Sequence, residues 1–426
     1  MKRCKSSCQT LSNEDMISQL PEALLLQILS LLPTKEVVAL SVLAKPWRFL
    51  WKMVPSLEFI YNATNDFERF SYNVSKCLLS HQALVLQSLH LVMNFDNASI
   101  MDIGKLMGIA FGRQLRQLVL EVYCGNLLRF PTSLYNCETL ETLELSHHIL
   151  IDVPFPVCFK SLRNLHLHNM EFKNDESVVN LLSGCVSLEN LVIHQSTEFN
   201  VKTFTIAVPS LQRLTLIVEY DEEFTVFVIN APSLKYLKIE GTLVDDGFCI
   251  IENTPELVEA SIIDVSRKVF ESILGSLASV QRLSLKIESP LEITLPPIRS
   301  TFYHLTHLEL SAYKTDWWNL LTLMLDTSPN LQFLKLIGFK IEWRPWPKWN
   351  QPKNVPECLL LHLETFVWAS YEARLEDEID VAKYILRNAR RLKKATFSKI
   401  EINSDMRVEE LKSVVRASNS CQLVFI

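Results

Sequence analysis

The chain has 426 residues, more than the ~250–300 residues at which a single hydrophobic core usually stops growing. Hydrophobic residues make up 48% of it and charged residues 21%, which favours a folded protein and excludes a disordered one. The net charge is −6, and the sequence contains no block of basic residues that would attract nucleic acid. It also contains no run of ~18 apolar residues, so no membrane-spanning helix is expected.

The first residues predict a short tail rather than a targeting signal. Residues 1–12 begin with the basic stretch Met1–Lys5 and lack the apolar core of a secretory signal, so we expect a flexible, solvated segment. The ten cysteines are scattered without a Cys-x-x-Cys pair, which favours reduced thiols. We therefore expect the protein in the cytoplasm, the nucleus or both.

Residues 13–60 predict three short helices. The first lies between Pro21, which suits the first turn of a helix, and Pro33, which should end it. Thr34 is expected to cap the second helix. The third should carry Trp47, Leu50 and Trp51. Three short helices form a core that is marginal alone, so an exposed apolar face on them would indicate docking to a partner.

The segment Asp15–Phe59 resembles the F-box motif of plant proteins. The matching parts follow in order: Leu20-Pro21, Leu31-Leu32-Pro33-Thr34-Lys35, Val37-Val38, Ser41-Val42-Leu43, Trp47-Arg48 and Leu50-Trp51. An F-box binds a Skp-family adaptor, which links it to a cullin and so to a ubiquitin-conjugating enzyme. The residues that the resemblance implies for the adaptor surface, as contacts or their support, are Leu20, Pro21, Leu24, Ile28, Leu31, Val37, Val38, Trp47, Leu50 and Trp51.

One part of this segment departs from the family. Ala44-Lys45-Pro46 stands where the family commonly has Ser-Lys-Arg. If Ala44 is the N-cap of the third helix, the lost hydroxyl costs about 0.5–2 kcal/mol, whereas Pro46 is tolerated in a first turn. We expect a weakened third helix. The departure also motivates an alternative, a repeat adaptor without a ligase role.

Residues 61–342 predict a leucine-rich-repeat solenoid. Aliphatic residues at positions 1, 4 and 6 of a short phrase recur thirteen times, at steps of 22 to 32 residues, and continue beyond residue 342. Positions 4 and 6 point to one side of a strand and positions 3, 5 and 7 to the other, which predicts a parallel sheet on the concave face. The first anchors are residues 86, 115, 140, 162, 188, 211, 234, 257, 280, 305, 331, 363 and 392.

The segments that return from one strand to the next predict some helices. These are expected at residues 98–111, 175–183, 267–275 and 317–326. Prolines shortly before an anchor should end the return segments at Pro209, Pro232, Pro255 and Pro329.

Residues 343–426 resemble the FBD domain found at the C-terminus of plant F-box/leucine-rich-repeat proteins. The parts that carry this resemblance are Val355-Pro356-Glu357-Cys358-Leu359, Leu363-Glu364-Thr365-Phe366, Tyr384-Ile385-Leu386, Asn388-Ala389, Leu392-Lys393 and Ser420-Cys421-Gln422-Leu423-Val424-Phe425. Asp377–Arg390 predicts an amphipathic helix with Ile379, Ala382, Ile385 and Leu386 inward. We expect the domain to continue and cap the solenoid.

A loop rich in tryptophan and proline opens this last region. It contains Trp343, Trp346 and Trp349. Tryptophan is frequent among the residues that dominate binding energies, so the loop could anchor a partner. Packing over the end of the solenoid is an equally good interpretation.

Histidines and basic residues on the concave positions are the candidates for binding a target. His168 and His194 share position 7 of adjacent repeats and should lie side by side, close to His166 and to the pair His147-His148. A zinc site would need more ligands, so ordinary polar surface is favoured and no metal or cofactor is expected. The tentative target-binding residues are His166, His168, His194, Arg213, Lys238, Arg282 and Lys286.

The basic residues in this set leave a second alternative open. Some F-box repeat proteins hold an inositol phosphate or a hormone in a basic concavity, so the chain could sense a small molecule. Glutamates such as Glu240 and Glu309 interleave with the basic positions, which favours a mixed-charge surface.

These observations predict an α/β protein with a three-helix F-box at 13–60, a leucine-rich-repeat solenoid at 61–342 with a parallel sheet on its concave face, and an FBD cap at 343–426. No Gly-x-Gly-x-x-Gly, P-loop or His-Glu-x-x-His motif occurs, so an enzyme is the least favoured class. The resemblance implies the non-catalytic substrate-recognition subunit of an SCF-type ubiquitin ligase, which joins a Skp-family adaptor and cullin to an unknown target protein.

Overall fold

The computed structural model describes residues 20–42, 45–62, 67–95, 103–196, 200–219, 225–241, 248–287, 301–312, 317–338, 349–371, 376–398 and 405–426. Its contacts group into two compact units, Met1–His148 (unit 1) and Ile149–Ile426 (unit 2). Among the described residues, no helix is both long enough and apolar enough to cross a membrane.

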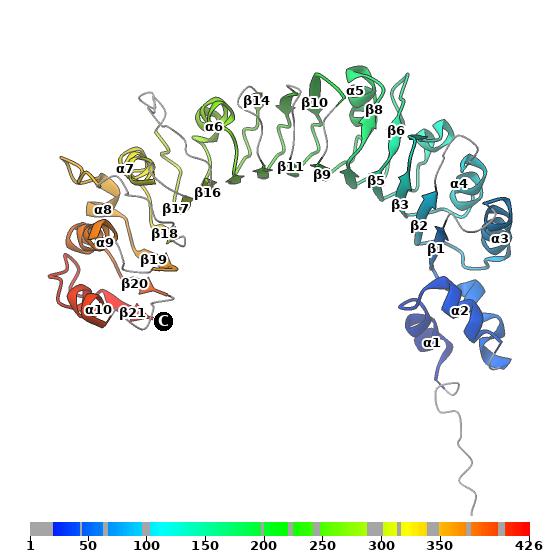
Figure 1. Ribbon diagram of the computed structural model, residues 1–426, viewed down its shortest axis with the longest axis horizontal. Coiled ribbons are helices and arrows are strands. Elements are labelled where there is room, and N and C mark those ends of the chain that lie inside the picture. Colours follow the sequence, from blue (N-terminus) through cyan, green and yellow to red (C-terminus); the bar gives the residue numbers. More distant parts are fainter. Residues whose placement is uncertain are drawn as a thin grey trace, which may run out of the picture. The chain divides into compact units, whose positions relative to one another are not determined.

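Unit 1 begins with two α-helices and two short 3-10 helices, coloured blue in Figure 1. They are α1 (Glu22–Leu29), α2 (Thr34–Leu40), η1 (Lys45–Arg48) and η2 (Leu50–Met53). The predicted third helix is therefore present as two short 3-10 helices, which contain Trp47, Leu50 and Trp51. Pro46, inside η1, has no N–H to donate, which favours short turns over a continuous α-helix. Ala44, the expected cap, lies outside the described residues.

The core of this helical part is small and apolar. Its buried residues are Leu25, Leu29, Val37, Leu50 and Val54. Leu20, Leu26, Leu32, Leu40, Trp47 and Trp51 are half-buried and pack against them. The sequence placed most of these side chains on helical faces, and their packing explains why four short segments hold together.

Thr34 has a different role from the predicted helix cap. Pro33 occupies the N-cap position of α2, and Thr34 is the first helical residue. Its buried hydroxyl accepts a hydrogen bond of 2.7 Å from the backbone N–H of Glu58. A threonine 24 residues away in the sequence thus satisfies a donor on the first strand of the sheet.

That sheet in unit 1 consists of parallel strands. β1 (Ser56–Asn62) pairs with β2 (Ser88–Phe95), β2 with β3 (Gln117–Cys124), and β3 with β5 (Thr142–His147). The return segments contain α3 (Phe67–Ser80), α4 (Gly104–Phe111), β4 (Leu128–Arg129) and the 3-10 helix η4 (Thr132–Asn136). The sequence predicted α4 but neither α3 nor β1. β1 starts within the predicted F-box segment, so the helical part runs directly into the sheet.

Backbone hydrogen bonds fasten the helical part to the first repeats. The carbonyl of Lys52 accepts from the N–H of Gln82 at 2.7 Å, and that of Pro55 accepts from the N–H of Gln87 at 2.8 Å. His81, which follows α3, places Nε2 2.7 Å from the carbonyl oxygen of Val54. No flexible linker separates the two parts of unit 1 at these contacts.

His81 makes this attachment sensitive to pH. Its side chain is 1% exposed, and Nδ1 has no hydrogen-bond partner among the described residues. Burial lowers the pKa of His81 from 6.5; the bond to Val54 opposes this, and the charge of Arg113 adds to it. Above pH ~6.5 His81 is neutral in both the folded and the unfolded state, so the lowered pKa does not affect the free energy of unfolding there.

Acidification should therefore destabilise unit 1 through His81. As the pH falls below ~6.5 the unfolded state takes up the proton first, so the free energy of unfolding decreases until the folded-state pKa is reached. We expect the unfolding temperature to fall between pH 7.5 and 5.5, and to fall less in His81→Gln, which keeps a donor for Val54. Equal slopes in the two proteins, measured by thermal unfolding, would rule out this origin.

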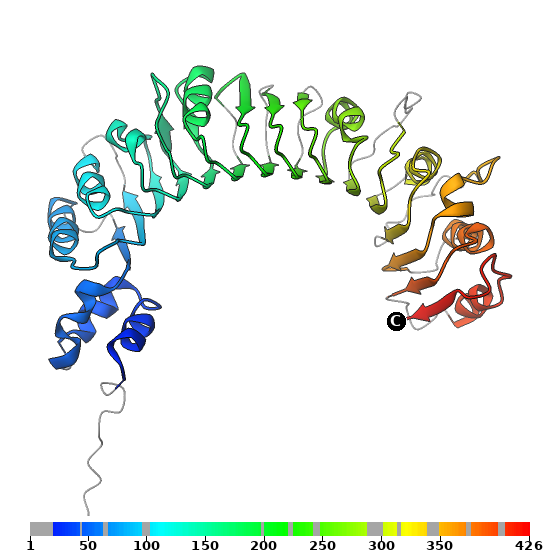
Figure 2. The same cartoon turned by 180° about the vertical axis from the view of Figure 1, so that it is seen from behind.

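Unit 2 continues as a stack of strands with residue-for-residue parallel pairing. Its main strands are β7 (Asn164–His168), β9 (Asn190–Gln195), β11 (Arg213–Val218), β13 (Tyr236–Glu240), β15 (Glu259–Ile263), β16 (Arg282–Ile287), β17 (His307–Ala312), β18 (Phe333–Ile337), β19 (Thr365–Ala369), β20 (Lys394–Phe397) and β21 (Gln422–Phe425). Within unit 2 the strands line the inner side of the curve, and helices lie behind them (Figure 1; Figure 2 from the other side). The predicted α/β fold with a parallel sheet is confirmed.

The return segments of unit 2 contain helices and a second layer of strands. The helices are α5 (Asp175–Ser183), α6 (Arg267–Leu274) with the 3-10 turn η5 (Gly275–Leu277), α7 (Trp317–Thr327), α8 (Glu357–Leu361), α9 (Glu376–Asn388) and α10 (Asp405–Lys412). β10 (Thr203–Ala207), β12 (Val226–Asn230) and β14 (Phe248–Asn253) form a separate parallel sheet, and β6 (Ile149–Ile151) pairs with β8 (Glu171–Phe172). The sequence predicted α5, α6 and α7 but not these return strands.

The aliphatic phrase builds the core as predicted. All thirteen first anchors, from Leu86 to Leu392, are at most 2% exposed. Along the strands, buried residues at positions 4 and 6 alternate with half-exposed ones, as in β7 and β13. Each repeat therefore contributes apolar side chains to one continuous interior, which is how a solenoid becomes stable.

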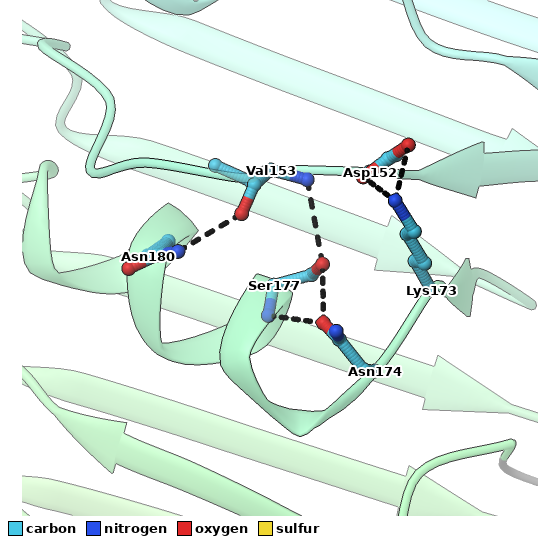
Figure 3. A network of polar contacts seen from close by, with 6 residues as sticks. All are labelled: Asp152, Val153, Lys173, Asn174, Ser177 and Asn180. Carbon is cyan, nitrogen blue, oxygen red and sulfur yellow. Dashed lines mark hydrogen bonds and ion pairs between the residues drawn. The ribbon is translucent and has the colours of Figure 1, made fainter.

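Polar side chains also link neighbouring repeats on the helix side. Asn174 caps α5: its Oδ1 accepts from the N–H and the hydroxyl of Ser177, at 3.0 and 2.8 Å. Ser177 and Asn180 in turn bond the backbone of Val153, and Lys173 pairs with Asp152 at 3.1 Å (Figure 3). These bonds fix the orientation of α5 on the preceding repeat.

The C-terminal region extends the solenoid. β19, β20 and β21 add strands to the same sheet, and α9 buries Ile379, Ala382, Ile385 and Leu386, as predicted. The Trp349 ring meets that of Tyr384 on α9 with 5.2 Å between centroids, and the backbone N–H of Trp349 donates to Asp377 Oδ1 at 3.2 Å. Trp349 thus packs on the solenoid; Trp343 and Trp346 lie outside the described residues.

Candidate interaction surfaces

The first helix of unit 1 carries apolar residues on both sides. Leu25 and Leu29 face the core, at 3% and 1% exposure. On the other side Leu24 and Ile28, four residues apart on one helical face, are 45% and 41% exposed, and Leu31, in the turn just after α1, continues this outer stripe at 85% exposure. A helix that is apolar all round is normally buried all round, so this outer stripe is typical of a surface that awaits a partner.

The ten residues predicted for the adaptor surface fall into three groups. Val37 and Leu50 are part of the buried core and can only support a surface. Leu20, Trp47 and Trp51 are half-buried against that core. Exposed side chains remain at Pro21, Leu24, Ile28, Leu31 and Val38.

Three exposed apolar residues close to these were not predicted. Val42 is 86%, Phe49 61% and Met53 36% exposed. Phe49 lies between η1 and η2, outside both helices, so no helical period in the sequence indicates which way its side chain points.

The sheet face of unit 1 carries a linked set of polar side chains. His90 lies between two carboxylates, with Nδ1 3.5 Å from Glu58 Oε1 and Nε2 3.0 Å from Glu121 Oε1. The hydroxyl of Tyr123 donates to the other oxygen of Glu121 at 3.1 Å. These residues come from three adjacent strands, and their contacts give this face a fixed, hydrophilic surface.

The predicted histidine pair forms on the sheet face of unit 2. His168 and His194 are opposite each other in β7 and β9, with ring centroids 5.6 Å apart in an edge-to-face arrangement. His194 Nε2 lies 3.0 Å from Glu219 Oε1, and His166 stands opposite Val192. In the part of the chain that the structure describes, no group of three or more His, Cys, Asp or Glu side chains could hold a metal ion.

The predicted basic residues are not gathered into one cluster. Arg213 lies over the ring of Tyr236 at 4.4 Å, since it stands opposite that residue rather than opposite Lys238. The other three basic residues each form an ion pair with an acidic neighbour. These pairs are Lys238–Glu240 at 2.5 Å, Arg282–Glu259 at 3.7 Å and Lys286–Asp264 at 3.7 Å. The surface is mixed in charge, which suits a protein partner better than a polyphosphate.

Buried thiols do not offer a nucleophile. Burial raises the pKa of Cys185, Cys249 and Cys358 to about 12. At neutral pH such thiols are protonated, and the thiolate is the reactive form. They serve as small apolar residues in the solenoid core.

Comparisons with known proteins agree with this architecture. The F-box domain family matches residues 17–59, the family described as "FBD-associated F-box protein At5g56370, LRR repeats" matches residues 109–258, and the FBD family matches residues 351–397. The F-box/FBD/LRR-repeat protein At3g26920 of Arabidopsis thaliana is 79% identical over 432 residues, which cover 100% of both chains. The chain belongs to the F-box/FBD/LRR-repeat family.

Other relatives of this F-box/FBD/LRR-repeat protein match at similar length. The putative F-box/FBD/LRR-repeat protein At4g13965 of Arabidopsis thaliana is 54% identical and covers 100% of each chain. The F-box/FBD/LRR-repeat protein At4g00160 of Arabidopsis thaliana is 50% identical over 97% of this chain and 94% of its own length. The resemblance noted in the sequence is thereby confirmed at both ends.

Family membership defines the general role. F-box domains generally bind Skp-like adaptors, and leucine-rich repeats generally bind target proteins. This F-box/FBD/LRR-repeat protein is accordingly a protein-interaction adaptor of a kind typical of SCF ligases, and proteins of this class are generally non-catalytic.

Proposed function

We propose that this chain is the substrate-recognition subunit of an SCF-type ubiquitin ligase. Its F-box would bind a Skp-family adaptor and through it a cullin, and its repeats would bind the protein to be modified. The chain itself would make and break no covalent bond. It would act by raising the effective concentration of the target near a charged conjugating enzyme.

The outer stripe of α1 carries this proposal. Leu24, Ile28 and Leu31 present apolar side chains that the described residues of unit 1 leave open to solvent. Val38, Val42 and Phe49 add exposed apolar surface on the same small helical part. Burial of such side chains is the main source of binding free energy in protein interfaces, and a Skp-family adaptor is the partner that the F-box family generally has.

The attachment of the F-box to the repeats supports the same role. Hydrogen bonds from Gln82 to Lys52 and from Gln87 to Pro55, together with the bond between Thr34 and Glu58, connect the helical part to the first strands. Such bonds limit how far the F-box can move against the first repeats, which a flexible linker would not do.

We further propose that the protein works in the cytoplasm, the nucleus or both. Thiols such as Cys185 and Cys249 are buried one by one in the core, as is usual for a protein of a reducing compartment. Fluorescence microscopy of the full chain with a tag at either end tests this, and accumulation in the secretory pathway would contradict it.

Reconstitution tests the ligase role. The full chain, co-expressed with a plant Skp-family adaptor and a cullin, should elute as one complex and should support ubiquitin transfer within that complex when activating and conjugating enzymes are added. A folded chain, judged by circular dichroism, that elutes without the adaptor would instead identify an interaction adaptor with no ligase role.

A further inference from the structure

The sheet face of unit 2 contains a depression over strands β15 to β18. The parallel register places residues of position 3 side by side across these strands, and those of position 5 in a second row next to the first. The first row is Glu259, Arg282, His307 and Phe333, and the second is Ser261, Ser284, Glu309 and Lys335.

Small side chains in the second row create the space. Ser284, together with Ala260 and Leu283, lines a cavity of about 280 Å³ that is open to solvent. Its walls are Glu259, Arg282, His307, Glu309 and Phe333. This volume is near the lower limit of pockets that hold a small ligand, which fits one long side chain of a bound protein.

The residues that line the cavity carry one more negative than positive charge, and Lys335 next to them offsets it. Two carboxylates, of Glu259 and Glu309, face the cavity with one guanidinium, of Arg282. Arg282 reaches Glu259 only at 3.7 Å, and Lys335, which is not part of the wall, approaches Glu309 through Oε2 at 3.1 Å. An incoming cation would be the third here, and would share Glu259 with Arg282 and Glu309 with Lys335.

The aromatic part of the wall favours a flat cation. The rings of His307 and Phe333 are stacked, with centroids 5.4 Å apart and an angle of 23° between planes. Thr306 Oγ1 lies 2.9 Å from His307 Nδ1 and holds the ring in this position. Partial burial and the charge of Arg282 lower the pKa of His307, so the imidazole is neutral at pH 7 and does not repel a cation.

We propose that this depression binds an arginine side chain of the target protein. The guanidinium would lie along the His307–Phe333 pair and donate to the Glu309 carboxylate, with Glu259 as a second acceptor. A guanidinium can both stack on aromatic planes and form forked bonds to a carboxylate, whereas the compact ammonium of lysine cannot. This inference rests on the proposed role of the repeats in target recognition and names the feature of the target that is read.

Selection of peptides on the immobilised full chain tests the proposal without knowledge of the target. A random nonapeptide phage library is the probe. Recovered peptides should carry arginine at one fixed position, and replacement of that arginine by lysine or by the uncharged citrulline should weaken binding about tenfold to hundredfold. Glu309→Gln, and separately Ser284→Trp, which fills the cavity, should weaken binding of the parent peptide by a similar factor.

Glu364→Gln is the matched control, because its carboxylate pairs with Lys393 at 2.7 Å beyond the depression. Binding of the parent peptide to this variant should be unchanged. The proposal is overturned if no peptide is recovered, if recovered peptides bind Ser284→Trp normally, or if they carry an acidic residue whose binding is lost in Arg282→Ala. Adaptor capture is measured separately, so failure of the ligase role and failure of this site are distinguished.

Discussion

Replacing Leu24, Ile28 and Leu31 together by alanine is expected to weaken adaptor capture by about 100-fold or more. Each is an exposed apolar side chain that an adaptor would bury, and burial of a leucine or isoleucine contributes roughly 1.5–3 kcal/mol. A loss of about 2.8 kcal/mol over the three residues already corresponds to 100-fold. Titration of the immobilised full chain with purified adaptor measures the change.

The fold of the variant should stay intact, because none of the three side chains belongs to the buried core. Alanine is also the strongest helix former, so α1 should persist. The matched control replaces Leu79, Leu84 and Val186, which are also apolar, are 64%, 96% and 66% exposed, and lie outside the F-box. Loss of capture in the control, or full capture in the α1 variant, would place the adaptor surface elsewhere.

Phe397→Ala should destabilise the C-terminal end of the solenoid by about 3–5 kcal/mol, the usual cost of removing a buried phenylalanine. Phe397 is fully buried, and its ring meets those of Phe366, Tyr371 and Phe425 at 5.2–5.7 Å. Because repeats contact only their neighbours, the effect should be local. Hydrogen exchange should show lost protection of amides in β19 to β21 while β9 to β13 keep theirs.

Lys394→Ala provides the comparison on the same strand. This side chain is exposed in β20, so its removal should change the free energy of unfolding by less than about 0.5 kcal/mol. Equal protection of β20 amides in Phe397→Ala and in the unaltered chain would mean that the aromatic cluster does not hold this end together.

The repeat architecture could be predicted because one local rule repeats. Every copy has three aliphatic residues at fixed spacing, which must be buried. An example is the copy Leu140, Leu143 and Leu145, in which each side chain is 1% exposed. The return strands were missed although they alternate in the same way. Phe204 and Ile206 are buried in β10, and a search for the two-residue period between anchors would have found them.

The candidate sites were harder to predict because they depend on contacts between distant residues. No local pattern links Thr34 to Glu58 or sets Arg213 against Tyr236. In α1 the consecutive leucines Leu24, Leu25 and Leu26 lie on different sides of the helix, so helical periodicity could not decide that Leu25 is inside and Leu24 outside. Those assignments needed the packing of the whole helical part.

The hydrogen bond between Thr34 and Glu58 bears on how the protein can be truncated for experiments. Strand β1 pairs with β2 on one side, and α2 supplies a hydroxyl to its other side. Deletion of residues 1–60 would remove most of β1 and leave β2 as an exposed edge strand, and such strands tend to pair with other chains. A variant that binds targets but not the adaptor is therefore better obtained by substitutions on α1 than by deletion of the F-box.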